Sequence, residues 1–164
     1  MLLDYNGTDN DIKEDIKFIN NNLDLSNNIY ISNINSGIGD ILLTKIYNNP
    51  KSTYVAHRLG SPRINIIDEE ILSLKDKPNN TKQLGIRPEN IKINTGTYEG
   101  KIRTTEALGA ETVIGIEYKQ IELLALFQGS FKGIKGDNIK FDIDTKNILY
   151  FNDRNENISW AQNS

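Results

Sequence analysis

Cysteine is absent from this 164-residue sequence, and histidine occurs once, as His57. Without cysteine the chain can form no disulfide, no cysteine-ligated zinc site, no iron–sulfur cluster and no thiol nucleophile. A catalytic triad would have to use His57 together with a nucleophile and an orienting acid, and Ser61 is only a polar residue nearby in sequence. We therefore interpret His57 as a surface or linker histidine and predict no catalytic residue and no metal ligand.

A strong excess of basic residues is also absent. The chain has 19 Lys and Arg against 22 Asp and Glu, for a net charge of −3, so we do not expect it to bind nucleic acid. No uninterrupted apolar run approaches the ~18 residues of a membrane-spanning helix. The N-terminus lacks the basic and apolar regions of a signal peptide. We expect a cytoplasmic protein of one domain, or of one domain and a fragment.

The sequence contains no loop of the kind that cradles phosphate. The pattern Gly-x-x-x-x-Gly-Lys-Ser/Thr does not occur, and Gly37-x-Gly39 is too short for a dinucleotide fingerprint. Tight nucleotide binding by this chain alone is therefore not expected, and no cofactor is predicted. Asp142 and Asp144 alternate with apolar residues beside Lys140, which places them on the solvent face of a strand. We interpret them as a charged edge that discourages edge-to-edge pairing.

The first 48 residues have a mixed pattern of strand and helix. Leu2-Leu3 is a strand stub, and a β-branched run at 29–31 is a second short strand. Between them Ile12, Ile16, Ile19 and Leu23 form one apolar stripe at helical spacing. The order strand, helix, strand is typical of a parallel crossover unit.

Beyond residue 62 the pattern changes to short strands and glycine turns. We expect strands at 63–67, 84–86, 101–108, 111–118, 121–128, 138–144 and 148–151. This number of strands in about 90 residues favours a small barrel or sandwich. Alternation predicts one buried face, consisting of Ile102, Ile114, Ile116, Leu123, Ile139, Phe141 and Ile143. The tail from Arg154 is polar, and we expect it to be frayed, apart from Trp160.

Three segments together resemble a known family. They are residues 46–56 (Ile-Tyr-Asn-Asn-Pro-Lys-Ser-Thr-Tyr-Val-Ala), 59–65 (Leu-Gly-Ser-Pro-Arg-Ile-Asn) and 84–91 (Leu-Gly-Ile-Arg-Pro-Glu-Asn-Ile). Their order and spacing are similar to the C-terminal part of the ATP-binding subunits of carbohydrate ABC importers. The downstream segments Glu106–Thr112, Lys135–Asp137 and Leu149–Phe151 also fit the accessory domain called TOBE. The resemblance covers about residues 45–153 and implies a mainly β, OB-like small barrel, in agreement with the strand pattern.

The segment upstream departs from that family. Leu2-Leu3-Asp4 is similar to the Walker B strand of the ATPase, but Tyr5 stands where the family has its catalytic glutamate. Asn33 stands where the family has a histidine, and the Asp-loop survives only as Gly7–Asn10. Tyrosine has a pKa near 10 and cannot accept a proton at pH 7 as a carboxylate does. The resemblance therefore implies a degenerate ATPase remnant that does not hydrolyse ATP.

These observations predict four regions and leave more than one function open. The regions are a remnant at 1–48, a linker at 49–62, the barrel at 63–153 and a polar tail at 154–164. The first hypothesis is an accessory or regulatory region that pairs with a full-length ATP-binding subunit or with itself, and that reaches the permease at the inner membrane face only indirectly. The second is a small-ligand or oxyanion site of the molybdate-binding type, with Ser61, Thr104, Thr105 and Thr112 as available hydroxyls. The third is a decayed gene product.

The resemblance also marks eight residues that we expect to be architectural rather than catalytic. Pro88 must end its strand or place it at an edge, and Arg87 has donors suited to a loop carbonyl or carboxylate. Glu89 is expected to cap the turn that follows. Residues 1–45 should either dock on the barrel or pair with a second copy, because their apolar stripe needs cover. The eight motif residues are Gly60, Ser61, Pro62, Asn65, Gly85, Arg87, Pro88 and Glu89.

Overall fold

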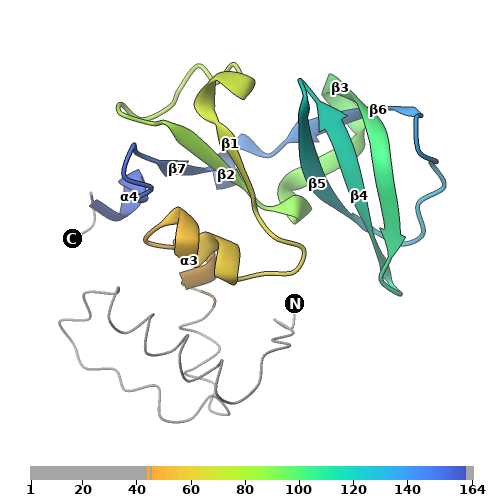
Figure 1. The fold of residues 1–164 in the computed structure, drawn as a ribbon, viewed down its shortest axis with the longest axis horizontal. Coiled ribbons are helices and arrows are strands. Elements are labelled where there is room, and N and C mark those ends of the chain that lie inside the picture. The colour runs from red at the N-terminus through yellow and green to blue at the C-terminus, as the bar shows by residue number, and fades with distance from the viewer. Residues whose placement is uncertain (1–43, 45, 162–164) are drawn as a thin grey trace, which may run out of the picture.

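The computed structural model describes residue 44 and residues 46–161 (Figure 1). The strands of this part form two antiparallel sheets, one of three strands and one of four. The predicted mainly β class is thereby confirmed. The strand–helix–strand unit predicted for 1–48, and the docking predicted for 1–45, lie outside the described residues apart from residues 44 and 46–48.

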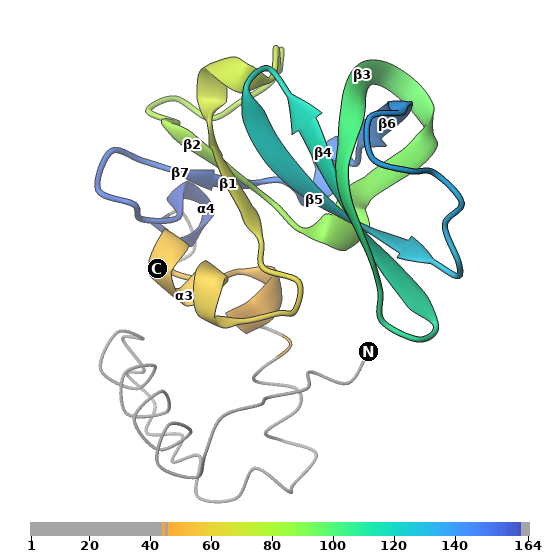
Figure 2. The same cartoon turned by 45° about the vertical axis from the view of Figure 1, so that its right-hand side comes forward.

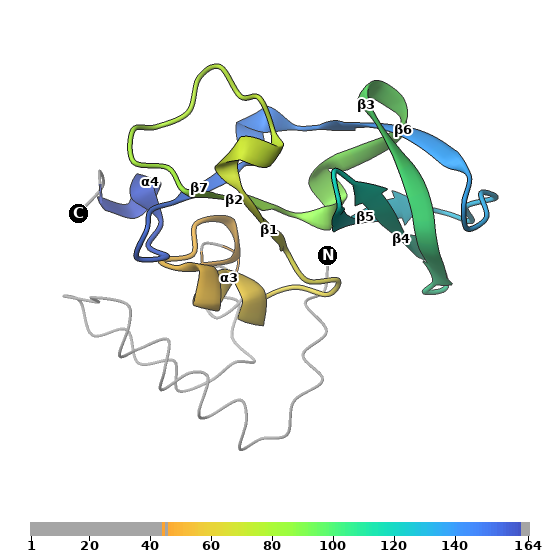
Figure 3. The same cartoon turned by 45° about the horizontal axis from the view of Figure 1, so that its top comes forward.

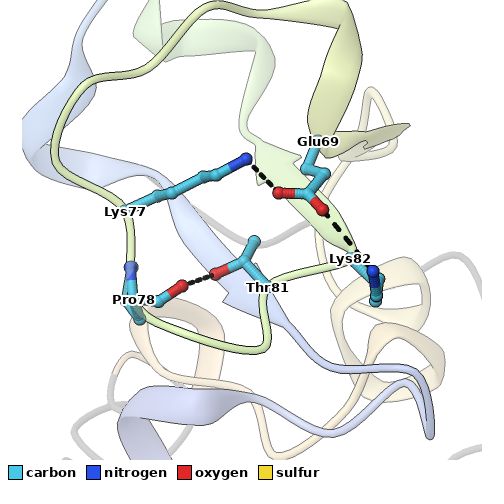
Figure 4. A network of polar contacts seen from close by, with 5 residues as sticks. All are labelled: Glu69, Lys77, Pro78, Thr81 and Lys82. Carbon is cyan, nitrogen blue, oxygen red and sulfur yellow. Dashed lines mark hydrogen bonds and ion pairs between the residues drawn. The ribbon is translucent and has the colours of Figure 1, made fainter.

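The three-stranded sheet has the order β1-β2-β7. It consists of β1 (Asn65–Asp68), β2 (Gln83–Ile86) and β7 (Leu149–Phe151). A short 3-10 turn, η1 (Glu69–Ile71), and a long loop join β1 to β2. Glu69 holds this loop, because its carboxylate accepts from Lys77 and lies 3.8 Å from Lys82 Nζ, while the Thr81 hydroxyl donates to the Pro78 carbonyl over 2.7 Å (Figure 4).

The four-stranded sheet has the order β5-β4-β3-β6. Its strands are β3 (Ile91–Ala107), β4 (Glu111–Tyr118), β5 (Ile121–Gln128) and β6 (Asn138–Ile143). The hairpin of β3 and β4 extends away from the three-stranded sheet (Figure 2). β4 and β5 have the bounds that alternation predicts.

β3 is longer than predicted, because it begins at Ile91 rather than near Gly100. Residues 94–97 (Asn-Thr-Gly-Thr) have the composition of a turn. In the structure they bulge out of β3, and the pairing with β6 resumes at Tyr98. Ile93 and Tyr98 both lie opposite Phe141, and between them Asn94 and Gly96 have φ of 62° and 104°. A Cβ at Gly96 would lie 2.4 Å from the Phe141 carbonyl oxygen, so only glycine fits there.

One apolar core lies between the two sheets. All seven residues predicted to face inward are buried, which confirms that expectation. Leu84 and Ile86 of β2 join them from the three-stranded sheet, so both sheets contribute to a single core. Phe141 is fully buried, and its ring stacks on Tyr98 at 5.4 Å and meets Tyr118 edge-on at 5.3 Å.

Two short helices lie beside the three-stranded sheet (Figure 3). Helix α3 (Thr53–Arg58) falls within the predicted linker 49–62, and its N-terminus is capped by the Ser52 hydroxyl, which accepts from Val55 N over 3.4 Å. Helix α4 (Ile158–Ala161) follows β7. Ala56 of α3 packs with Ile64 and Phe151 in a second apolar cluster, so this segment shares buried surface with the sheet. In the part of the chain that the structure describes, no helix has the length and apolar character needed to cross a membrane.

Replacing Phe141 by alanine should lower the free energy of unfolding by about 3–5 kcal/mol, because it removes a fully buried ring and leaves a cavity. Urea denaturation followed by circular dichroism measures this change. Lys140→Ala, at the exposed neighbouring position on β6, should change stability by less than about 0.5 kcal/mol. Equal effects of the two substitutions would contradict the assignment of the core.

Candidate functional site

Some of the motif residues meet at Arg87, where helix α3 contacts the end of strand β2. Arg87 directly follows β2 and is only 4% exposed. Pro88 occupies the first position of the 3-10 turn η2 (Pro88–Asn90), and Arg87 has the extended backbone that a residue before proline prefers. The strand therefore ends at Arg87, and its side chain turns inward.

The Arg87 guanidinium donates to three backbone carbonyl groups of the segment before the barrel. Nη1 donates to Ala56 O over 3.1 Å and to Leu59 O over 2.6 Å. Nη2 donates to Tyr47 O over 2.8 Å. Ala56 and Leu59 lie at the C-terminal end of α3, where helix carbonyls lack intrahelical partners. Arg87 thus supplies the donors for that helix end, and its positive charge suits the negative end of the helix.

Tyr47 and Glu89 complete this cluster, which we term the Arg87 junction (Tyr47, Ala56, Leu59, Arg87 and Glu89). The Arg87 guanidinium carbon lies 3.7 Å from the centroid of the Tyr47 ring. The Tyr47 hydroxyl donates to Glu89 Oε1 over 2.5 Å, so Glu89 contacts the preceding segment in addition to its place in η2. Burial, and then this bond to a carboxylate, raises the pKa of Tyr47 well above its ordinary value of 10.0.

Gly60 permits the junction to close. Its φ is +105°, and a Cβ there would lie 2.9 Å from Tyr47 Cε2 and 3.3 Å from Arg87 Nη1. A side chain at this position would therefore be strained and would crowd the guanidinium. Ser61 is exposed, Pro62 is half-buried, and the peptide bond between them is cis.

Asn65 connects the two sheets. It is buried, and its side-chain nitrogen donates to Ile86 O over 3.0 Å in the three-stranded sheet and to Leu124 O over 2.9 Å in β5. Its side-chain oxygen accepts from Leu124 N over 2.7 Å. The Asn65 side-chain amide thus provides hydrogen-bond partners for both the N–H and the C=O of Leu124 at the edge of β5, and it holds that edge next to β2. Gly85 allows close packing nearby, since a Cβ would lie 2.8 Å from the Phe151 ring.

Asn157 is a buried polar residue that the sequence reading missed. It is 2% exposed, and its side-chain nitrogen donates to Pro50 O over 2.8 Å and to Asn49 Oδ1 over 2.9 Å. Asn157 N also donates to Lys51 O over 2.8 Å. The expectation of a frayed tail from Arg154 is therefore wrong for the described residues as far as Ala161. No local pattern indicates this contact, because its partners lie more than a hundred positions earlier in the chain.

The polar and charged candidates predicted from the sequence lie at exposed, half-buried and buried positions. His57 is exposed, as expected, and Asp142 and Asp144 are half-buried. Thr112 is buried, and its hydroxyl donates to Gly129 O over 2.8 Å, whereas Ser61, Thr104 and Thr105 are exposed. Among residues 44 and 46–161, no three acidic or histidine side chains lie close enough together to hold a metal ion.

Replacing Arg87 by methionine should lower the free energy of unfolding by about 3 kcal/mol or more, because buried carbonyl groups lose their donors. Arg87→Lys keeps the charge but loses the planar fork, so it should fall between the wild type and methionine. Urea denaturation provides the values. Arg103→Ala, at an exposed position, serves as the control, and equal stability of the methionine variant and this control would refute the role given to Arg87.

The raised pKa of Tyr47 predicts a loss of stability at high pH. The unfolded chain releases the Tyr47 proton near pH 10.0 but the folded chain does so only at higher pH, so this contribution is present below pH 10.0 and lost as the pH rises above it. Tyr47→Phe should be less stable at neutral pH, because the bond to Glu89 is lost, but its stability should fall less steeply above pH 10.0. Urea denaturation at a series of pH values from neutral to above pH 10.0 measures this difference in slope. An unchanged slope in Tyr47→Phe would contradict the assignment.

The chain is similar in sequence to ATP-binding proteins of import and transport systems. The chain is 32% identical over 131 residues to the sn-glycerol-3-phosphate import ATP-binding protein UgpC of Psychromonas ingrahamii, which covers 65% of this chain and 35% of that protein. It is 27% identical over 133 residues to the alpha-glucoside transport ATP-binding protein AglK of Rhizobium meliloti, which covers 65% of this chain and 37% of that protein.

A second UgpC protein, from Rhizobium etli, is 31% identical over 74 residues, which covers 41% of this chain and 21% of that protein. No family model matches the chain. The chain thus spans little more than a third of the length of the Psychromonas UgpC and of AglK. The resemblance predicted from the motifs is confirmed: the chain is similar to the ATP-binding proteins of sugar ABC importers, in a partial match that fits the C-terminal part of such a subunit.

Proposed function

We propose that this chain acts as the accessory, regulatory C-terminal region of the ATP-binding subunit of a carbohydrate importer, and that residues 1–164 do not themselves hydrolyse ATP. The Arg87 junction is the observation that carries the proposal. Arg87, the most distinctive motif residue of this junction, donates to three carbonyl groups of its own chain. Such a residue builds a scaffold, and an accessory domain needs a scaffold of fixed shape.

The other motif residues support the same role. Asn65 bonds the two sheets together, and Gly60 and Gly85 provide space where a Cβ would meet a neighbouring side chain. The segment 49–62 packs against the three-stranded sheet, and the residues from 154 to 161 bond to that segment and, at Asn157, bridge to Phe151 of β7. We therefore propose that the boundaries between the four predicted regions do not separate folded units, and that the described residues fold as one unit.

The chemistry of ATP hydrolysis supports the second half of the proposal. Phosphoryl transfer to water requires a loop that holds the phosphates with Mg²⁺ and a group that positions the attacking water. The sequence lacks the pattern Gly-x-x-x-x-Gly-Lys-Ser/Thr, and the position directly after Asp4 holds Tyr5 rather than an acidic residue. Asp4 alone could contact a metal that no phosphate loop holds.

The names of the relatives support a role that does not depend on the transported molecule. Two of them are named for glycerol 3-phosphate and one for alpha-glucosides, although all three are named as ATP-binding proteins of import or transport. We propose that the partner is a full-length ATP-binding subunit or a second copy of this chain. Contact with the permease, at the inner face of the membrane, is then indirect.

Purified residues 1–164 should show no ATP hydrolysis above the buffer background, because the phosphate loop is missing. A coupled assay for released phosphate, at saturating ATP and Mg²⁺, measures this. Asp4→Ala is the matched control and should behave identically to the wild type. Turnover of about 1 s⁻¹ or faster that Asp4→Ala abolishes would overturn the proposal.

A further inference from the structure

A pocket opens on the four-stranded sheet where β5 ends and β6 begins. Its volume is about 450 Å³, within the range of roughly 300–1,000 Å³ that is common for small-ligand sites. Four of its side chains are apolar: Ile102, Phe127, Phe131 and Ile139. Ile102 and Ile139 belong to the buried core, so the apolar lining is continuous with it. We term this hollow the β5–β6 pocket, lined by residues 94, 102, 127, 130–133 and 137–139.

The loop between β5 and β6 forms one wall of the pocket, and hydrogen bonds hold it to the sheet. Near its start, Phe131 N donates to Thr112 Oγ1 over 3.4 Å. At its end, Asp137 O accepts from Ile102 N over 2.9 Å, and Asp137 Oδ2 accepts from Ile134 N over 3.0 Å. The wall therefore has its shape before a ligand arrives, which lowers the entropy cost of binding.

The bulge of residues 94–97 brings a polar side chain to the pocket. Ile93 and Tyr98 lie opposite the same residue, Phe141, so the four residues between them are additional to the pairing of β3 with β6. Asn94, the first of them, lines the pocket and has a φ of 62°. Such a left-handed backbone is unfavourable for most residues other than glycine and concentrates at functional sites. The bulge thus adds an amide group to the wall opposite the loop.

The polar side chains around the pocket have unused hydrogen-bonding groups. In the part of the chain that the structure describes, the side chains of Asn94, Ser130 and Asn138 have no hydrogen-bond partner. Together they present both donors and acceptors. An apolar ligand that covered these groups would remove them from water without replacing their hydrogen bonds, which is costly. The pocket therefore favours a ligand with polar groups around an apolar body.

The charges at the pocket cancel. Of the described residues that line it, Lys132 and Asp137 are charged, and their signs are opposite. A phosphate or another oxyanion would meet the Asp137 carboxylate, and a cationic ligand would meet the Lys132 ammonium group. A neutral ligand encounters neither repulsion, so the pocket favours a neutral ligand over a charged one.

A sugar ring combines these properties. A pyranose carries hydroxyl groups around its edge, each of them a donor and an acceptor, and its faces contain apolar C–H groups. Phe127 and Phe131 are half-buried, and their rings meet at 70° with 5.6 Å between the centroids. A flat nucleobase could stack on only one of two rings that meet at this angle, whereas the puckered face of a pyranose can contact both.

We propose that the β5–β6 pocket binds a neutral carbohydrate. A C–H face of the sugar lies on Phe127 and Phe131. Its hydroxyl groups bond to Asn94, Ser130 and Asn138. The sugar then bridges the bulge of β3 and the loop between β5 and β6, and it stabilises the folded chain by mass action. This names a ligand for the proposed accessory role in a carbohydrate importer and rests on that role.

An NMR titration of the full chain with two neutral glycosides, methyl α-D-glucopyranoside and methyl β-D-galactopyranoside, tests the site. At least one of them should shift the amide signals of residues 94, 130–133 and 137–139, with a Kd on the order of 1 mM, as expected for a ligand of this size. Saturation of the aromatic protons should transfer to the C–H protons of the bound sugar. Unchanged signals with both glycosides at about ten times that concentration would overturn the proposal. Stronger binding of glycerol 3-phosphate or adenosine at these residues would overturn it as well.

Two matched variants test the role of the bulge. Asn94→Gly removes the amide but keeps a residue that tolerates the positive φ, so it should weaken glycoside binding about fivefold. Asn155→Gly is the control, because Asn155 is also exposed and also has a φ of 62°, but it lies in the turn after β7. Its affinity should equal that of the wild type, and urea denaturation confirms that both variants are folded. Equal affinities of the two variants would refute the contact with Asn94.

The outcomes separate this site from the proposed function. ATP turnover by the chain would count against the proposed function and leave the glycoside titration intact. A chain without turnover whose pocket binds neither glycoside would count against this site alone.

Discussion

A guanidinium group buried beneath a helix end is the constraint on which the rest of the described structure depends. Arg87 is almost fully enclosed, and a buried charge is costly unless polar groups surround it. Among the residues that the structure describes, no carboxylate contacts it directly. Three carbonyl groups and the face of Tyr47 do so instead, and these belong to a segment that sequence reading treated as a linker. The sheets and this segment therefore depend on each other, since each would leave further polar groups unpaired without the other.

Asn65 applies the same principle between the sheets. Two small sheets around one core expose edges, and an unpaired edge is a liability. The Asn65 amide fills one such place by accepting from and donating to Leu124 of β5 while it bonds to Ile86 of β2. The motif that contains Asn65 and the motif that contains Arg87 thus fix the two joints of the fold: sheet to sheet, and helix to sheet.

The sheets were largely predictable because their signal is local. Alternation located β4 and β5 to the residue and identified the buried face, including Phe141. The excursion in β3 was hidden, because an Asn-Thr-Gly-Thr run has the composition of a turn whether or not the strand continues beyond it. Helix α3 has six residues, too few for a periodic stripe, and its ends are satisfied by Ser52 and by the distant Arg87. Asn157 was missed because asparagine is common in polar tails, and only the fold brings it to Asn49 and Pro50. The family resemblance marked Arg87 and Asn65 as important, but their partners became visible only in three dimensions.

Native-state amide hydrogen exchange tests the central claim, that the segment before the barrel and the sheets form one unit through Arg87. Exchange measured by NMR gives an opening free energy for each amide, and amides that open together report the same value. We predict that the amide of Ala56, which donates to the carbonyl of the α3 N-cap residue Ser52, has the same opening free energy as the amides of β2. A much lower value at Ala56 than in β2 and β4, with the helix opening while the sheets stay closed, would contradict it.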